Sequence, residues 1–197
     1  DVMYCVFLGK SVGTIAPALG SVTNTMLAGS IATSKLADGS TFATTNGITV
    51  VDQWYMDTSF SGNGDITSNW TSTMPYTSYG VIGSAVTESS GVFTFPSTGI
   101  WRVQHITNVQ IDSGADDFIV QIQYNFSTNS GSSYNTQNAP LIGHYNPSTL
   151  VRLQHSFFVN YDVTDASTTR FKMSTSSIGG GTTIGTIFLA FTRLGDT

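Results

Sequence analysis

Hydrophobic and polar residues alternate along the chain from residue 47 onward, with the period of two that a half-buried β-strand requires. Within residues 151–163 the odd positions are apolar except His155 and the even positions are polar except Phe158, and residues 118–126 alternate in the opposite phase. Further strands are predicted at residues 48–56, 93–95, 100–111, 171–173 and 184–194. Turns rich in Gly, Asn and Ser separate them, and no helical period appears. The pattern therefore predicts an all-β domain of the sandwich or jelly-roll type.

Two of these predicted strands carry apolar residues on both faces. In residues 184–194 Ile187, Leu189 and Phe191 lie on one side of the strand, and Phe188 and Ala190 lie on the other. Phe158 is an apolar residue on the otherwise polar face of its strand. A sandwich buries only one face of each sheet, so we expect another subunit to cover Phe158, Phe188 and Ala190. Burial of each aromatic side chain would contribute about 1.5–3 kcal/mol.

The first 46 residues follow a different pattern. Residues 2–8 form one apolar, β-rich run, and residues 20–37 hold two nine-residue units, GSVTNTMLA and GSIATSKLA. Nine residues rotate a helix by roughly 900°, which places the second unit on the opposite face, and an odd period also changes the face of a strand. One chain alone cannot bury both units on one side.

This repeat has two interpretations. A flexible linker rich in Gly, Ser and Thr is one of them. The other, which we favour, is a stem in which parallel chains bury the same apolar positions against each other. The positions predicted to be buried in the stem are Val22, Leu27, Ile31 and Leu36.

Composition narrows the class of protein. Hydrophobic residues make up 40% of the 197 residues, which is enough for a sizeable core, but charged residues reach only 10%, below the roughly 25% of ordinary soluble domains. A net charge of −5 with only seven Lys and Arg argues against nucleic-acid binding. No apolar run approaches the roughly 18 residues of a membrane span. The single cysteine cannot form an intrachain disulfide, so stability must come from packing or oligomerisation.

The sequence contains no recognisable catalytic constellation. His105, His144 and His155 are widely spaced, and no zinc-protease or nucleophile-elbow motif is present. His105 and His155 share the inward register of their strands, so we expect hydrogen-bonded core histidines. We therefore expect neither enzymatic activity nor a resident cofactor.

Two sets of polar and aromatic residues remain as candidate sites. Three carboxylates in the segment IDSGADD are weak candidates for a Ca²⁺ site, although a solvated turn is the commoner arrangement; they are Asp112, Asp116 and Asp117. Four tyrosines lie in loop-like stretches beside Asn, Ser and Gly, a mixture that suits recognition of a sugar or a protein but that also occurs in ordinary loop packing. They are Tyr76, Tyr79, Tyr134 and Tyr145.

Several segments resemble a known family. GVFTFPSTGIW (91–101) and GTIFLAFTRLG (185–195) resemble segments of the C1q/TNF-like family, and the resemblance extends over residues 47–197. WYMDTSFSGNGDITSNW, TESSGVFTFPSTGIW and TRLGDT are similar to C1q-like domains of bacteriophage structural proteins. The LGK at 8–10 and the repeated G-S-[VI]-x-x-x-[KM]-L-A unit resemble stem regions of phage fibres. The resemblance implies a jelly roll that forms trimers around a threefold axis, and some C1q-like trimers carry calcium near that axis.

These observations predict three parts of a trimeric phage virion protein. Residues 1–10 end an upstream anchoring domain that binds other virion proteins, residues 11–46 form an extended stem, and residues 47–197 form the C1q-like knob. We expect the chain to be the C-terminal part of a longer polypeptide on the virion surface. The knob is predicted to hold the homotrimer together and to contact a host surface glycan or protein. The alternatives are a capsid-attached head fibre or decoration protein, and a secreted C1q-like ligand or lectin.

Overall fold

The computed structural model describes residues 48–72, 80–115, 117–140, 142–144 and 147–197. The chain divides into two units, Asp1–Ala43 and Thr44–Thr197, and every described residue belongs to the second. The described residues form strands and no helix. The strands are β1 (Val50–Met56), β2 (Gly64–Asp65), β3 (Trp70–Thr71), β4 (Thr87–Ser89), β5 (Val92–Thr94), β6 (Gly99–Ile111), β7 (Asp117–Ser127), β8 (Asn135–Asn138), β9 (Ile142–His144), β10 (Val151–Val163), β11 (Arg170–Ser176) and β12 (Thr182–Gly195).

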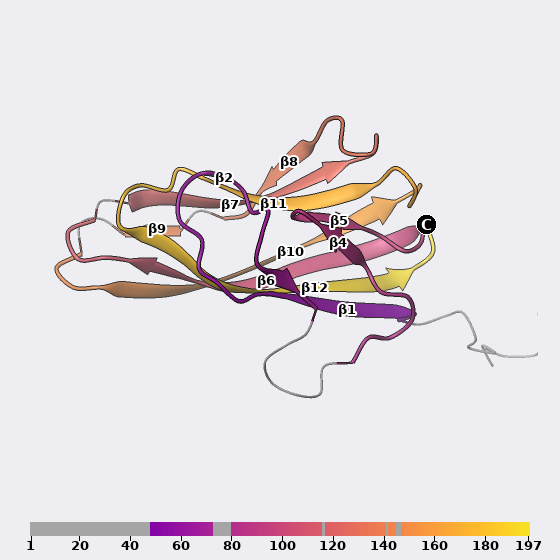
Figure 1. The fold of residues 1–197 in the computed structure, drawn as a ribbon, viewed down its shortest axis with the longest axis horizontal. Helices are drawn as coiled ribbons and strands as arrows, with labels where there is room; N and C mark the ends of the chain where they lie inside the picture. The colour runs from indigo at the N-terminus through magenta and orange to yellow at the C-terminus, as the bar shows by residue number, and fades with distance from the viewer. Residues whose placement is uncertain (1–47, 73–79, 116, 141, 145–146) are drawn as a thin grey trace, which may run out of the picture. The chain divides into compact units, whose positions relative to one another are not determined.

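The strands form two antiparallel sheets, which lie as two layers in Figure 1. Sheet A has the order β10-β6-β12-β1-β3, and sheet B has the order β4-β5-β11-β7-β8, with β2 paired to β11 and β9 paired to β7. Each sheet joins strands that are distant in sequence, since β1 pairs with β12 and β5 pairs with β11. This two-layer arrangement with crossing connections confirms the predicted all-β jelly-roll sandwich.

The core is filled from the inward-facing positions of both sheets. The phenyl ring of Phe93 on β5 lies with its centroid 5.9 Å from that of Phe171 on β11 and 5.3 Å from that of Phe191 on β12. Trp101 and Tyr124 are also fully buried. Because these side chains come from both sheets, their burial joins the two layers, and each contributes about 1.5–3 kcal/mol.

Two local features set the strand register. β4 and β5 are joined by the two-residue turn Ser90-Gly91, whose φ angles of 53° and 79° are both positive, as a type I′ hairpin turn requires. In β12 the register shifts between Ile184 and Ile187. This irregularity lets both isoleucines point inward although three positions separate them.

A buried carboxylate fixes the loop before β4. The side chain of Asp52 on β1 is 1% exposed, and its Oδ2 accepts a 2.8 Å hydrogen bond from the backbone N–H of Val86. The N–H of Gln53 and Nε1–H of Trp54 also donate to this carboxylate, at 2.8 and 3.3 Å. Three N–H donors compensate for the loss of hydration of the buried charge.

Candidate functional site

The outward face of sheet A carries a patch of exposed apolar side chains. Ile106, Phe158 and Phe188 are 39%, 50% and 38% exposed, although each lies on a long, well-paired strand. Together with two half-buried neighbours they form what we call the apolar patch: Tyr55, Ile106, Phe158, Phe188 and Ala190. Exposed apolar side chains that gather on one face indicate an interaction surface, whereas single ones are common on any protein surface.

The register of the strands explains why these side chains meet. Ile106 on β6 is paired with Phe188 on β12, and Phe188 is paired with Tyr55 on β1, so the three stand in one row across the sheet. The rings of Tyr55 and Phe188 lie 4.9 Å apart between centroids. Phe158 occupies the next row, where its partner Gln104 is itself paired with Ala190. A shallow hollow between the rows is lined by Gln53, Gln104, Ile106, Phe188, Leu189 and Ala190.

The three residues predicted to be covered by another subunit therefore lie on one face of one sheet. Phe158 stands beneath the guanidinium of Arg102, whose Cζ is 4.6 Å from the ring centroid. Ile106 was missed in the sequence, although it stands between Gln104 and Asn108 on the polar register of its strand, as Phe158 does on β10. Coverage of this face by other subunits stays a prediction.

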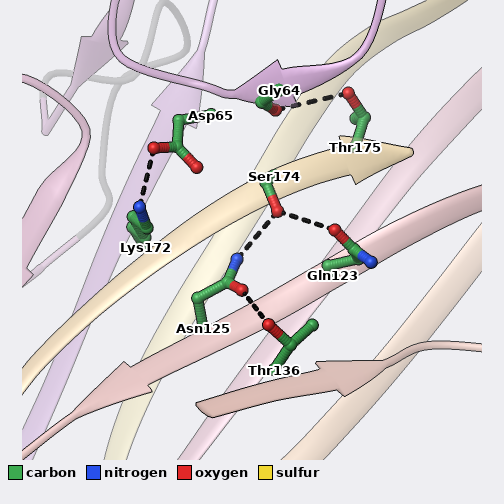
Figure 2. A network of polar contacts seen from close by, with 8 residues as sticks. All are labelled: Gly64, Asp65, Gln123, Asn125, Thr136, Lys172, Ser174 and Thr175. Atoms are coloured by element: carbon green, nitrogen blue, oxygen red, sulfur yellow. Dashed lines mark hydrogen bonds and ion pairs between the residues drawn. The ribbon is translucent and has the colours of Figure 1, made fainter. Parts of the chain in front are cut away.

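The outward face of sheet B is different, because most of its side chains on β7, β8 and β11 are amides and hydroxyls that bond to each other (Figure 2), although Ile119 is also exposed on this face. The Asn125 amide donates to Ser174 Oγ at 2.8 Å and accepts from Thr136 Oγ1 at 2.7 Å. Ser174 Oγ donates to Gln123 Oε1 at 3.0 Å. The network continues beyond the residues drawn, from Gln123 Nε2 to Asn138 Oδ1 at 3.0 Å. Beside it a separate hydrogen bond of 2.9 Å runs from Ser176 Oγ to Gln121 Oε1. We call this set the polar strip: Gln121, Gln123, Asn125, Thr136, Asn138, Ser174 and Ser176.

Two members of the polar strip are buried although they point away from the core. Asn125 and Ser174 are only 5% and 6% exposed. Their oxygen and nitrogen atoms are engaged with side chains on neighbouring strands, so their burial leaves no large cost of unsatisfied polar groups. The network therefore ties β7, β8 and β11 together on the outside of the sheet.

Tyr134, one of the predicted recognition tyrosines, lies beside this strip. The ammonium of Lys172 stands over its ring, 4.1 Å from the centroid. The same ammonium pairs with Asp65 Oδ2 at 2.7 Å (Figure 2). Lys172 and Asp65 thus cancel each other's charge at the end of the strip, and one face of the Tyr134 ring is occupied by a cation.

A third polar group lies inside the sandwich. His105 Nε2 and His155 Nδ1 are 2.8 Å apart, and His105 Nδ1 is 2.7 Å from the hydroxyl of Tyr124. The Tyr124 hydroxyl donates to the backbone oxygen of Phe157 at 3.1 Å. Both histidines are core residues, as the strand register predicts, but their contact across β6 and β10 was not predicted.

Burial keeps both imidazoles neutral. It lowers the pKa of His105 to about 3, with a further contribution from the neighbouring His155. Burial also lowers the pKa of His155, an effect that the backbone carbonyl of Pro140 opposes. No hydrogen bond of regular geometry joins His155 Nε2 to any described residue. Burial raises the pKa of the Tyr124 hydroxyl, so this group also stays uncharged.

The remaining predicted site residues are only partly described. Asp112 is exposed, and its Oδ1 accepts from Gln110 Nε2 at 3.2 Å. Asp116 lies outside the described residues, and of Asp117 only the backbone, at the start of β7, is described. Among the described side chains no group of three or more His, Cys, Asp or Glu is placed to hold a metal ion. Tyr76, Tyr79 and Tyr145, and the stem residues Val22, Leu27, Ile31 and Leu36, lie outside the described residues.

Comparisons with known proteins give structural likenesses alone. No protein-family model matches the chain, and no curated protein matches it. The structure is similar to the crystal structure of murine APRIL at pH 5.0, with a TM-score of 0.46 and 11% identity over 74% of this chain and 98% of that one. It is also similar to the PRD1 vertex protein P5, with a TM-score of 0.44 and 14% identity over 75% of this chain and 99% of that one. In the described part of the chain, no helix is long and apolar enough to span a membrane.

Proposed function

We propose that the chain is a bacteriophage virion structural protein, a trimeric fibre whose jelly-roll knob holds the three chains together and contacts the host surface. The observation that carries the proposal is the apolar patch on sheet A. Its position on the outward face is where the C1q/TNF-like resemblance expects subunits to meet, and its exposed aromatic residues require a cover. No catalytic step and no resident cofactor are part of the proposal.

A trimer needs a second surface as well. In a closed threefold ring each contact is heterologous, so the patch of one subunit must meet a different surface of the next. The best candidate is a groove between β8 and β10, the edge strands of the two sheets, which we call the edge groove. Its lining combines apolar and aromatic side chains with three amides and two hydroxyls: Phe126, Asn135, Thr136, Gln137, Val159, Asn160 and Tyr161.

The aromatic floor of the edge groove suits this role. The rings of Phe126 and Tyr161 are stacked with centroids 3.9 Å apart and planes 8° from parallel. Tyr161 is only half-buried, so its ring still offers apolar area to a neighbour. Contact between the apolar patch and the edge groove would bury aromatic surface on both sides, and aromatic residues are enriched at such interfaces.

The first 46 residues complete the proposed fibre. Residues 1–10 contact the other virion proteins as the end of an anchoring domain, and residues 11–46 form the trimeric stem. Attachment of the same anchor to the capsid would make the protein a head fibre or decoration protein. A secreted C1q-like ligand or lectin is the alternative outside the virion.

The first test is the oligomeric state and the location of the chain. Light scattering after size exclusion of the 197-residue chain should give three times the mass of one chain, 21.0 kDa. Gold-labelled antibodies against residues 48–197 should decorate the tails of virions of the phage that encodes the chain. Label on the head would favour the head-fibre alternative, and a virion without label would contradict the proposal.

The second test concerns contact with the host. Fluorescently labelled trimer should bind the bacteria that the phage infects and should slow adsorption of the phage to them. A trimer that is found on the virion but binds no cells would leave only the structural part of the proposal standing.

A further inference from the structure

The outward face of sheet B is available for binding a ligand if the outward face of sheet A is covered by other subunits. If sheet A faces the threefold axis, the opposite face of the sandwich points away from that axis, so sheet B stays in contact with solvent except along β8. There the edge groove shares Thr136 with the polar strip, whereas Gln121 and Asn138 do not line the groove. We propose that the polar strip on sheet B binds an uncharged polysaccharide of the host surface. This inference rests on the proposed host contact and names the surface and the ligand class for it.

The polar strip presents hydrogen-bond donors that its own network does not use. Gln121 receives a hydrogen bond on Oε1 from Ser176, and Asn138 receives one on Oδ1 from Gln123. Their amide nitrogens, Nε2 of Gln121 and Nδ2 of Asn138, donate to no described residue. An amide carries two N–H donors, so these two side chains offer four donors to a ligand.

The same network holds these donors in place. Gln121 and Gln123 stand two positions apart on β7, and Asn138 is the cross-strand partner of Gln123 on β8. Directly opposed and diagonal neighbours on a sheet are within about 8 Å of each other, so the free amides lie within the span of a short oligosaccharide. Because each side chain is already fixed by a hydrogen bond at its oxygen, little rotamer freedom is lost when a ligand binds.

The chemistry of the strip selects an uncharged partner rich in hydroxyl groups. All seven members are amides or hydroxyls, and the nearest cation, Lys172, is already paired with Asp65. Sugar hydroxyls accept from amide N–H groups and donate to the remaining hydroxyl and amide lone pairs. A protein partner would need an anchor of clustered aromatic or aliphatic side chains, and the strip has none, because Ile119 beside it on β7 is a single exposed apolar side chain. Weak binding at one strip would be strengthened by the three copies on a trimer.

The test uses two substitutions that remove donors and keep the network. In Gln121→Glu and Asn138→Asp a carboxylate oxygen still accepts from Ser176 or Gln123, but the free N–H donors are lost. The control is Ser84→Glu, which adds the charge of one of these substitutions at an exposed position before β4, at the edge of sheet B opposite to β8. The full chain and the double variant Gln121→Glu/Asn138→Asp are compared as trimers by light scattering before any binding measurement.

The probes are immobilised dextran, mannan and galactan as uncharged polysaccharides, and alginate and hyaluronan as anionic ones. We expect the unsubstituted trimer to bind at least one uncharged polysaccharide and neither anionic one. The double variant should bind that polysaccharide at least tenfold more weakly, while Ser84→Glu should bind it like the unsubstituted trimer.

Several results would overturn this inference. They are binding to the anionic polysaccharides only, binding to none of the five, and equal binding by the double variant. The proposed host contact is measured separately, with labelled trimer on host cells. If the double variant still binds cells as well as the unsubstituted trimer, the host contact stands and the polar strip is not its surface.

Discussion

The outward faces of sheets A and B expose opposite kinds of side chain to solvent. Each is the outer side of an antiparallel sheet whose inner side is buried in the core. Sheet A leaves Ile106, Phe158 and Phe188 exposed, whereas sheet B covers Asn125 and Ser174 with a closed set of polar contacts. A face whose polar groups satisfy each other is stable in water, and a face of exposed aromatic residues gains free energy only when another surface covers it. The comparison separates a face that we propose to be covered by other subunits from a face whose buried polar groups already satisfy each other.

The largest expected effect comes from placing a charge in the apolar patch. Phe188→Asp would remove an aromatic ring from each subunit contact of the proposed trimer and would add a carboxylate that association has to desolvate. We expect the variant to be monomeric at concentrations at least a hundredfold above those at which the unsubstituted trimer dissociates, as measured by analytical ultracentrifugation.

Asn108→Asp is the matched control for Phe188→Asp, because Asn108 is exposed on the same face but outside the apolar patch. It should stay trimeric. A Phe188→Asp chain that remains a stable trimer would show that the apolar patch is not the interface.

The second effect is the pH dependence of stability that arises from His105 and His155, which contact each other in the core of the sandwich. Folding lowers the pKa of both imidazoles below the unfolded value of 6.5. The free energy of unfolding is therefore unaffected by the titration of these two groups above pH 6.5. It decreases as the pH falls from 6.5 toward the folded pKa, which is about 3 for His105. The loss for His105 amounts to at most about 5 kcal/mol, at about 1.4 kcal/mol for each pH unit.

Urea unfolding between pH 7 and pH 5 measures this slope, because most carboxyl groups stay ionised in that range. His155→Gln should flatten the slope, since one of the two titrating groups is gone and the polar contact with His105 can be kept. An unfolding free energy that does not change between pH 7 and pH 5 would contradict the buried, neutral state of the pair.

A smaller effect is expected on the polar side of the comparison. Asn125→Ala removes the acceptor of Thr136 and the donor to Ser174 from a buried position. We expect the free energy of unfolding to fall by about 1–2 kcal/mol with no change in oligomeric state. Asn138→Ala, at an exposed position of the same network, should cost about 0.5 kcal/mol or less in the same urea titration. Dissociation of the Asn125→Ala trimer would show that the two faces are not independent.

The smallest effect is expected at the charged end of the polar strip. Lys172→Met removes the ion pair with Asp65 and the cation over Tyr134, but the side chains of Lys172 and Asp65 are 21% and 43% exposed. Exposed pairs of this kind contribute at most about 1 kcal/mol, and less as salt is added. The difference in melting temperature between Lys172→Met and the unsubstituted chain should therefore shrink when the NaCl concentration is raised about tenfold, from about 0.05 M to about 0.5 M.

The sequence predicted the long strands well because their alternation is itself the signal. β6, β7, β10, β11 and β12 all lie where the apolar period of two placed them. Of the short strands only β5 was predicted, and the others were missed for a physical reason. β8 reads Asn-Thr-Gln-Asn and is exposed throughout, so it carries no apolar period, and its pairing with β7 is visible only in three dimensions.

The candidate sites were predictable to different degrees. Phe158 and Phe188 could be found because an apolar residue on a polar register stands out within a single strand. The polar strip could not be found, since Gln121, Gln123 and Asn125 look like an ordinary solvated face until Ser174, Ser176 and Thr136 arrive from other strands. The contact between His105 and His155 likewise joins residues 50 positions apart, and register alone predicted only that both point inward.

The place of β12 has a consequence for how the protein is made. This strand, the last one described, lies in the interior of sheet A between β6 and β1, where it supplies Ile187, Leu189 and Phe191 to the core. Sheet A therefore cannot close until the ribosome has translated the residues up to Gly195, and β1 must wait for β12 while all the strands between them are made. A chain cut before β12 would lack this central strand. A complete β12 is thus a condition both for a closed sheet A and for the apolar patch, because Phe188 and Ala190 lie on this strand.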